Sequence, residues 1–119
     1  MRAQEFNAAI EVTEEVVVIR LEGELDAHTA VTADDSLTQA AESASKQLLI
    51  DCTQLHYVSS TGLGVLLSTF HFCQSKGIRM VLFGMQPKIK NVLSILGMER
   101  IWHQTTTEAE AMQVGPASA

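Results

Sequence analysis

The alternation of apolar, strand-like segments with helix-like ones constrains the fold of this chain most. Residues 15–21 (EVVVIRL) are β-branched and apolar on both faces, which is typical of a strand covered on both sides. Residues 47–52 (QLLIDC) and 78–83 (IRMVLF) are further apolar segments, and a stretch with helical spacing precedes each of them. Strands joined through a helix of this length run in the same direction. The sequence therefore predicts an α/β fold with a mixed, mostly parallel β-sheet and helices packed against its faces.

The remaining elements complete a β-β-α-β-α-β-α order. Helices are predicted over residues 28–44, over residues 60–76 before Gly77, and from Pro87 to Gly97. Residues 7–12 are predicted to form an opening hairpin with the next strand, and Ile101–Trp102 a short edge strand. One or two helical turns are expected from Thr107. A length of 119 residues predicts a single domain over 1–119, with a core of about 8–112 and a frayed tail over 113–119.

Composition and charge exclude several classes of partner. Hydrophobic residues make up 46% of the chain and charged residues 18%, as in a folded globular protein, while an aromatic share of 5% predicts an aliphatic core. The net charge is -6, and no basic cluster exceeds the pair Lys88 and Lys90. Nucleic acid or an anionic membrane as main partner would need a concentrated basic face. We expect a cytoplasmic protein that is monomeric when free, since no secretory or membrane-spanning segment is evident.

The histidines and cysteines do not predict a metal or cofactor site. The four histidines show no metal-ligand spacing with either Cys52 or Cys73. The two cysteines lie in apolar runs without CxxC spacing, and we expect them to be buried free thiols. The chain contains no glycine-rich phosphate-binding motif. We therefore expect no metal, no cofactor and no nucleotide site.

The most informative segment is YVSSTGLGVLL, residues 57–67, where a helix begins at Ser59, Ser60 or Thr61. One of these hydroxyls can cap the free amides of the first helical turn. Another can remain exposed where those amides and the helix dipole favour a negative group such as a phosphate. The two glycines of the segment each cost a helix about 0.5–1 kcal/mol relative to Ala, which predicts close approach by another backbone or by a partner. An ordinary N-cap followed by glycines that permit packing explains the same residues.

Three segments in this order resemble the STAS domain of bacterial anti-sigma factor antagonists. They are VIRLEGELDAHTA at residues 18–30, YVSSTGLGVLLS at 57–68 and PKIKNVLSILGMERIW at 87–102. The resemblance covers roughly residues 8–112. It implies a regulator that, when unphosphorylated, binds an anti-sigma factor that is also a serine kinase, and so frees the sigma factor. The kinase then phosphorylates the regulator and breaks the complex, and a PP2C-type phosphatase restores it.

The resemblance also implies which residues act. The family pattern is Asp-Ser-[Ser/Thr]-Gly-[Leu/Ile] with the first serine modified, which makes Ser60 the phosphorylation site and Ser59 its competitor. Ser59 stands where the family has Asp, a loss that could slow the reaction, redirect it to Ser59 or reflect a different partner. The partner-binding residues implied are those around this helix start and on the neighbouring rim: Glu24, Asp26, Ser59, Thr61, Gly62 and Leu63. Asp26 can also cap the first helix, and we expect both roles.

Two other functions fit parts of the sequence. A STAS domain can be a constitutive scaffold subunit of a stress-signalling assembly or of a lipid-transport ABC complex, and the missing Asp agrees with that role. An enzyme would need Ser59, Ser60 or Cys52 as its nucleophile. No nucleophile elbow is present, and no base or orienting acid can be assigned around these serines. We therefore expect a binding regulator that is not an enzyme.

Overall fold

The computed structural model describes residues 6–117, so residues 1–5 and 118–119 of the expected domain and tail lie outside the described residues. Nine elements follow one another along the chain. The strands are β1 (Phe6–Val12), β2 (Val16–Leu25), β3 (Gln47–Val58), β4 (Arg79–Phe83) and β5 (His103–Thr105). The helices are α1 (Ala30–Ser43), α2 (Ser60–Lys76), α3 (Pro87–Ile95) and α4 (Glu108–Val114). The last helix thus extends two residues into the segment expected to be a frayed tail.

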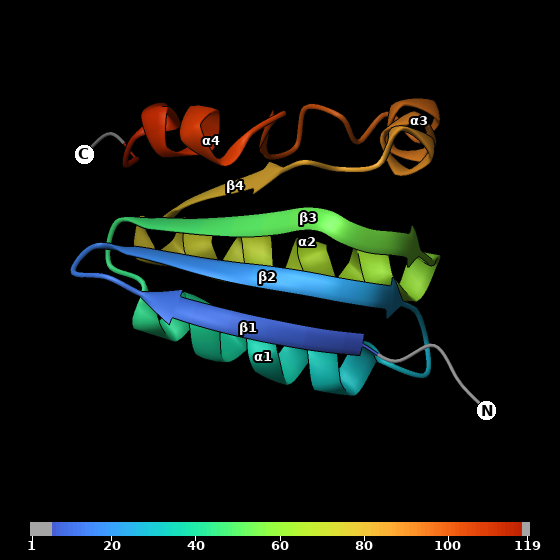
Figure 1. Ribbon diagram of the computed structural model, residues 1–119, viewed down its shortest axis with the longest axis horizontal. Coiled ribbons are helices and arrows are strands. Elements are labelled where there is room, and N and C mark those ends of the chain that lie inside the picture. Colours follow the sequence, from blue (N-terminus) through green and yellow to red (C-terminus); the bar gives the residue numbers. More distant parts are fainter. Residues whose placement is uncertain (1–5, 118–119) are drawn as a thin grey trace.

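The five strands form one sheet in the order β1-β2-β3-β4-β5, the same as their order in the chain. β1 is antiparallel to β2, as the short hairpin turn requires, and the other neighbours are parallel. The predicted α/β class and the mixed, mostly parallel sheet are therefore confirmed. Each crossover helix returns the chain to the position beside the strand it has just left (Figure 1).

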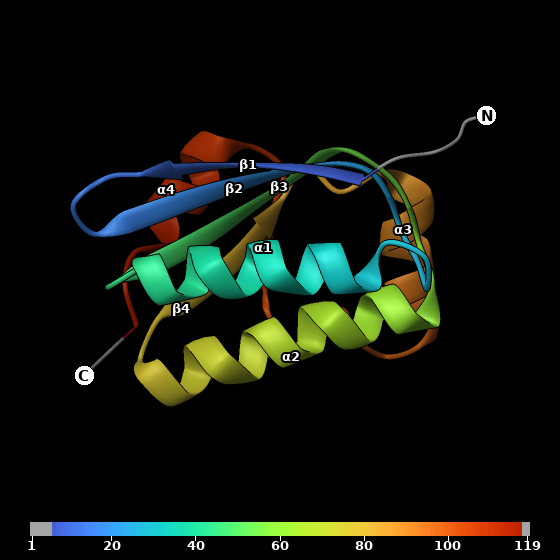
Figure 2. The ribbon, with the colours of Figure 1, turned by 90° about the horizontal axis from the view of Figure 1, so that it is seen from below.

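Helices cover the two faces of the sheet unequally. α1 and α2 lie side by side on one face (Figure 2), where Ile19, Leu37 and Leu66 belong to the main apolar core. α4 lies on the other face, where Ala111 packs with Leu49 in a smaller core. Residues 16–18 at the start of β2 are thus covered on both sides, which explains why this part of the sequence is apolar throughout.

Beyond α4 the second face is polar, and it is organised around Arg20 of β2. The Arg20 guanidinium contacts Glu11 of β1 at 2.8 Å, Asp51 of β3 at 2.9 Å and Glu108 of α4 at 2.9 Å. Burial of the Asp51 carboxyl acts to raise its pKa. Hydrogen bonds from the Thr53 amide and hydroxyl and from Arg20 outweigh this effect and hold the pKa below its ordinary value. Arg20 therefore joins three strands and one helix by charge.

Asp51→Asn is expected to lower the melting temperature at pH 7 and to flatten its dependence on acid. Folding lowers the Asp51 pKa, so its stabilisation is complete above the unfolded-state value near 3.9 and is lost as pH falls through the folded value. Asp51 is the buried member of this partly exposed network, and removing its charge is expected to cost about 1–3 kcal/mol. Thermal melts from pH 7 to pH 2 test this, with Asp35→Asn on exposed α1 surface as control. Equal acid slopes for Asp51→Asn and wild type would contradict it.

Three predicted boundaries were wrong, and local geometry explains two of them. β2 reaches Leu25 and β3 reaches Val58, whereas the sequence predicted ends at 21 and 52. The pairing of β3 with β2 shifts register twice, and at each shift β3 contains one residue more than β2. These extra residues disrupt the alternation of apolar and polar side chains that marks a strand. The edge strand forms at His103–Thr105 instead of Ile101–Trp102, because Trp102 is buried in the main core.

Both cysteines are buried free thiols, as the sequence predicted. Burial raises the pKa of the Cys73 thiol to about 11. Burial and the nearby Asp51 raise the Cys52 pKa further. A thiol must lose its proton to act as a nucleophile, so the structure gives no support to Cys52 as a catalytic residue.

Candidate functional site

Ser59 is the N-cap of α2, which resolves which of the three hydroxyls caps the helix. Its backbone is extended, and its hydroxyl accepts a hydrogen bond from the Gly62 amide at 3.2 Å. Its carbonyl accepts the Leu63 amide at 2.8 Å, the first bond of the helix. A Ser oxygen can replace the carboxylate of the family Asp in this role, because either atom accepts the amide proton. Compared with the Asp of the family pattern, Ser59 still caps the helix but carries no negative charge.

Ser60 and Thr61 are the first two residues of α2, and both are exposed. Among the described residues, neither of their backbone amides donates to an acceptor. Two free amides at the positive end of a 17-residue helix favour a negative group. Since the Ser59 hydroxyl is engaged in capping, the hydroxyls of Ser60 and Thr61 are the two left open at this helix start.

Position 62 requires a glycine because the end of β2 approaches the helix closely there. A Cβ atom added at Gly62 would lie 2.3 Å from the carbonyl oxygen of Leu25, the last residue of β2. The same carbonyl accepts a hydrogen bond from the Ser59 amide at 2.9 Å. Close approach by another backbone was one of the two explanations for the glycines, and it is the correct one for Gly62. A Cβ at Gly64 would meet nothing within 4 Å, so packing does not require that glycine.

The turn that follows β2 lies beside the start of α2, because Leu25 at the end of β2 contacts Ser59 and Gly62. The Asp26 carboxylate accepts the amides of His28 at 2.9 Å and Thr29 at 3.2 Å, which closes the turn before α1. The N-cap residue of α1 is Thr29, and its hydroxyl donates to the Glu24 carbonyl at 2.8 Å instead of capping. The prediction that Asp26 caps the first helix was therefore wrong in position. The Asp26 carboxylate instead accepts hydrogen bonds from backbone amides in the turn that leads into the helix.

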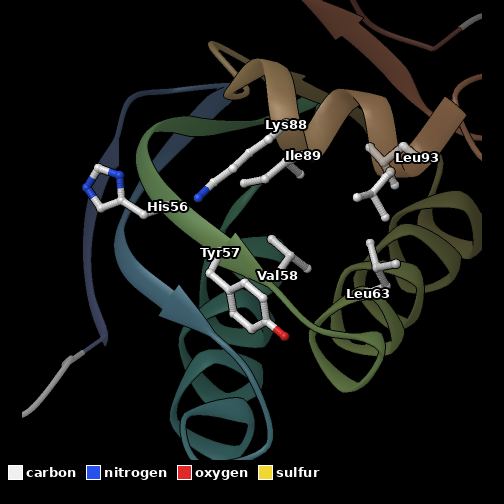
Figure 3. Close-up of a pocket in the computed structure, with 8 residues that line it drawn as sticks. His56, Tyr57, Val58, Leu63, Lys88, Ile89 and Leu93 are labelled. Carbon is white, nitrogen blue, oxygen red and sulfur yellow. The ribbon is translucent and has the colours of Figure 1, made fainter. Parts of the chain in front are cut away.

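A small apolar groove of about 130 Å³ opens next to the start of α2. Figure 3 shows Leu63 of α2 and Ile89 and Leu93 of α3 pointing toward one another around the groove, with Val58 of β3 beside them. The Lys88 side chain reaches from α3 toward β3 at its rim (Figure 3). The full lining is His56, Tyr57, Val58, Leu63, Lys88, Ile89, Val92 and Leu93.

The structure brings Glu24, Asp26 and residues 59–63 to one end of the molecule, where the end of β2 meets the start of α2. Tyr57 and Val92, which are 47% and 44% exposed beside this end, were not among the site residues predicted from the sequence. A signal for Val92 was present, since the apolar positions 89, 92, 93 and 96 are too many for the buried face of a short helix. Tyr57 carried no signal because its strand was predicted to end at residue 52.

Comparisons with known proteins identify the family. The STAS domain family model matches residues 7–111. The anti-sigma-B factor antagonist of Listeria monocytogenes is 31% identical over 108 residues, which is 88% of this chain and 95% of that protein. This chain belongs to the STAS-domain family of anti-sigma factor antagonists.

Two solved structures extend the likeness. The anti-sigma factor antagonist SpoIIAA in its unphosphorylated form is 27% identical with a TM-score of 0.73, over 92% of this chain and 95% of that one. The phosphorylated form of SpoIIAA from Bacillus gives a TM-score of 0.68 at 27% identity, over 92% and 98% of the two chains. SpoIIAA thus exists in both states.

Within residues 6–117, no three His, Cys, Asp or Glu side chains gather where they could hold a metal ion. None of the helices in that part of the chain is long and apolar enough to cross a bilayer.

Proposed function

We propose that this chain is a phosphorylation-switched binding regulator and not an enzyme. Its unphosphorylated form binds an anti-sigma factor that is also a serine kinase, and this binding frees a sigma factor. The kinase phosphorylates Ser60, the complex separates, and a PP2C-type phosphatase reverses the modification. The relatives named as anti-sigma factor antagonists support this role.

One observation carries the assignment to Ser60. The Ser60 hydroxyl is exposed at the first position of α2, while the Ser59 hydroxyl accepts the Gly62 amide. A phosphate on Ser60 would lie near the unpaired amides of Ser60 and Thr61, which favour about two negative charges. The matching position of the pattern Ser-Thr-Gly-Leu points to the same residue. The phosphorylated form of the relative SpoIIAA supports phosphorylation as the kind of modification.

The same charge accounts for release of the partner. A kinase closed over the start of α2 would cover Ser60 together with the apolar groove. Burying a phosphate there without matching cations is costly. Lys88 is the one Lys or Arg among the groove residues. It belongs to this chain and is present before the kinase binds, so binding adds no new cation to offset the phosphate.

The direct test is to incubate the protein with its cognate kinase and ATP and to locate the phosphate by tandem mass spectrometry. One phosphate on Ser60 is expected, and treatment with a PP2C-type phosphatase should remove it. A phosphate on Ser59 would overturn the assignment, and no phosphate at all would overturn the switch.

The constitutive scaffold, in a stress-signalling assembly or a lipid-transport ABC complex, is the second candidate. It is favoured by Ser59, which retains the cap of α2 but lacks the charge of the family Asp. A scaffold would bind its partner equally with and without ATP. Pull-down from lysate with wild type and Ser60→Asp separates the two functions, since the substitution should release the partner only in the switched regulator.

Asp26→Asn is expected to weaken kinase binding by about 2–5 kcal/mol, the cost of a lost charge pairing at a desolvated interface. Its effect on stability should be smaller, about 1 kcal/mol, because the amide oxygen of Asn can still accept the His28 and Thr29 amides. Calorimetric titration and a thermal melt measure the two quantities. Equal, small losses in both would leave Asp26 with the turn as its only role.

A further inference from the structure

β1 is an edge of the sheet with few of the features that usually block pairing with another strand. Edge strands commonly carry charged side chains, above all Lys, or Pro or a bulge. The one charged side chain of β1 is Glu11, which pairs with Arg20 of β2 at 2.8 Å. β1 reads FNAAIEV, and its register with β2 is continuous from Phe6↔Gly23 to Val12↔Val17. The opposite edge, β5, has only three residues. Figure 2 looks onto β1, and no helix of the described chain crosses in front of it.

The hairpin shows which backbone groups of β1 are free. The Thr13 amide donates to the Val16 carbonyl at 2.9 Å, so these two residues form a hydrogen-bonded pair. Hydrogen-bonded and non-hydrogen-bonded pairs alternate along antiparallel strands. Residues 7, 9 and 11 therefore bond to β2. The amides and carbonyls that point away from β2 are those of Phe6, Ala8, Ile10 and Val12.

This set of free groups is self-complementary. If two copies of β1 pair about a two-fold axis at Ala9, residue 8 lies opposite residue 10 and residue 6 opposite residue 12. The free backbone amides and carbonyls of these residues then face one another and can form hydrogen bonds between the copies. Ala9 of each copy then forms the central non-hydrogen-bonded pair, where side chains approach most closely and methyl groups fit. Asn7 lies opposite Glu11 of the second copy, and its amide can donate to that carboxylate.

We propose that β1 is a homodimerisation edge through which a second copy of this chain extends the sheet. A single pair of seven-residue strands buries less than the ~1,200 Å² of a standard stable interface. The dimer is therefore weak, and the monomer expected from the sequence is the dilute form. Two copies each carrying a charge of -6 repel, so added salt strengthens the association. No residue of β1 lines the groove beside α2, so the dimer is independent of the proposed switch.

Sedimentation equilibrium from about 10 µM to about 1 mM tests the proposal, a range suited to weak association. The wild-type mass should rise from 13.0 kDa toward twice that value. A9K and A9E should each remain at 13.0 kDa, because like charges meet at the two-fold axis. An equimolar mixture of the two should dimerise again, since the charges are then opposite. A109K adds the same charge on exposed α4 surface and should dimerise like wild type.

A thermal melt of each variant checks that it is folded. Ala8→Pro gives a second test, because it removes an outward amide without removing a bond to β2, and it should also stay monomeric. A wild-type mass that stays at 13.0 kDa up to the highest concentration would overturn the proposal. So would A9K or A8P dimerising as wild type does, or a mixture of A9K and A9E that remains monomeric.

Discussion

Ser60→Ala is expected to bind the kinase and to remain bound after ATP is added, while Ser60→Asp binds poorly even without ATP. Alanine keeps the start of α2 uncharged, so a partner can cover it but cannot modify it. Aspartate places a carboxylate where the interface closes, at an expected cost of roughly 10²-fold in affinity, or about 3 kcal/mol. Surface-bound kinase with each variant, before and after ATP, measures both effects.

Ser59→Ala is the matched control for this pair. It removes the hydroxyl that accepts the Gly62 amide at 3.2 Å and should cost about 1 kcal/mol of stability. It leaves the Ser60 hydroxyl in place, so ATP should still release the kinase, at a changed rate. Complete release of Ser60→Ala by ATP would show that the switch lies elsewhere in the chain.

Gly62→Ala and Gly64→Ala are expected to change stability in opposite directions although both replace a glycine in the same helix. At Gly62 the new Cβ would lie 2.3 Å from the Leu25 carbonyl oxygen, so α2 must move away from the end of β2. Forced overpacking of this kind costs about 1–3 kcal/mol. At Gly64 the new methyl group meets nothing within 4 Å, and alanine should stabilise the helix by about 0.4–1 kcal/mol.

Thermal and urea melts of the two alanine variants measure this difference. For a domain of this size each kcal/mol shifts the melting temperature by about 4 °C or more. Kinase binding provides a second readout, because displacement of α2 at Gly62 also displaces Ser60. A stable Gly62→Ala variant would mean that the contact between Leu25 and α2 relaxes freely, and a destabilised Gly64→Ala variant would mean that the glycine serves something other than packing.

The sequence predicted the sheet and its helices because each signal lay within one element. The apolar face of a helix or the β-branched run at 15–21 depends on residues that are neighbours in the chain. The end of β3 could not be predicted in this way. Its two register shifts are set by pairing with β2, and a strand with extra residues loses the period of two on which sequence reasoning depends.

The site was predictable in part for the same reason. The three hydroxyls and the glycines after them mark a helix start without knowledge of the fold. That Ser59 is the capping residue follows from where α2 begins in the structure. That position 62 needs glycine beside Leu25 follows from the approach of β2 to α2. The groove could not be predicted from the sequence, because Tyr57, Leu63 and Val92 come from three elements that meet only in the folded chain.

The contact at Leu25 has a consequence for how a partner distinguishes the two states of this chain. Its carbonyl holds the Ser59 amide at 2.9 Å and rests against Gly62, so the first turn of α2 is clamped to the sheet. If Ser60 is the modified residue, as proposed, we expect a phosphate there to change the charge of this surface more than the shape of its backbone. The partner would recognise the modified chain by electrostatic potential alone. Salt screens such a potential within about 8–10 Å, so the contrast between the two states would fade as ionic strength rises.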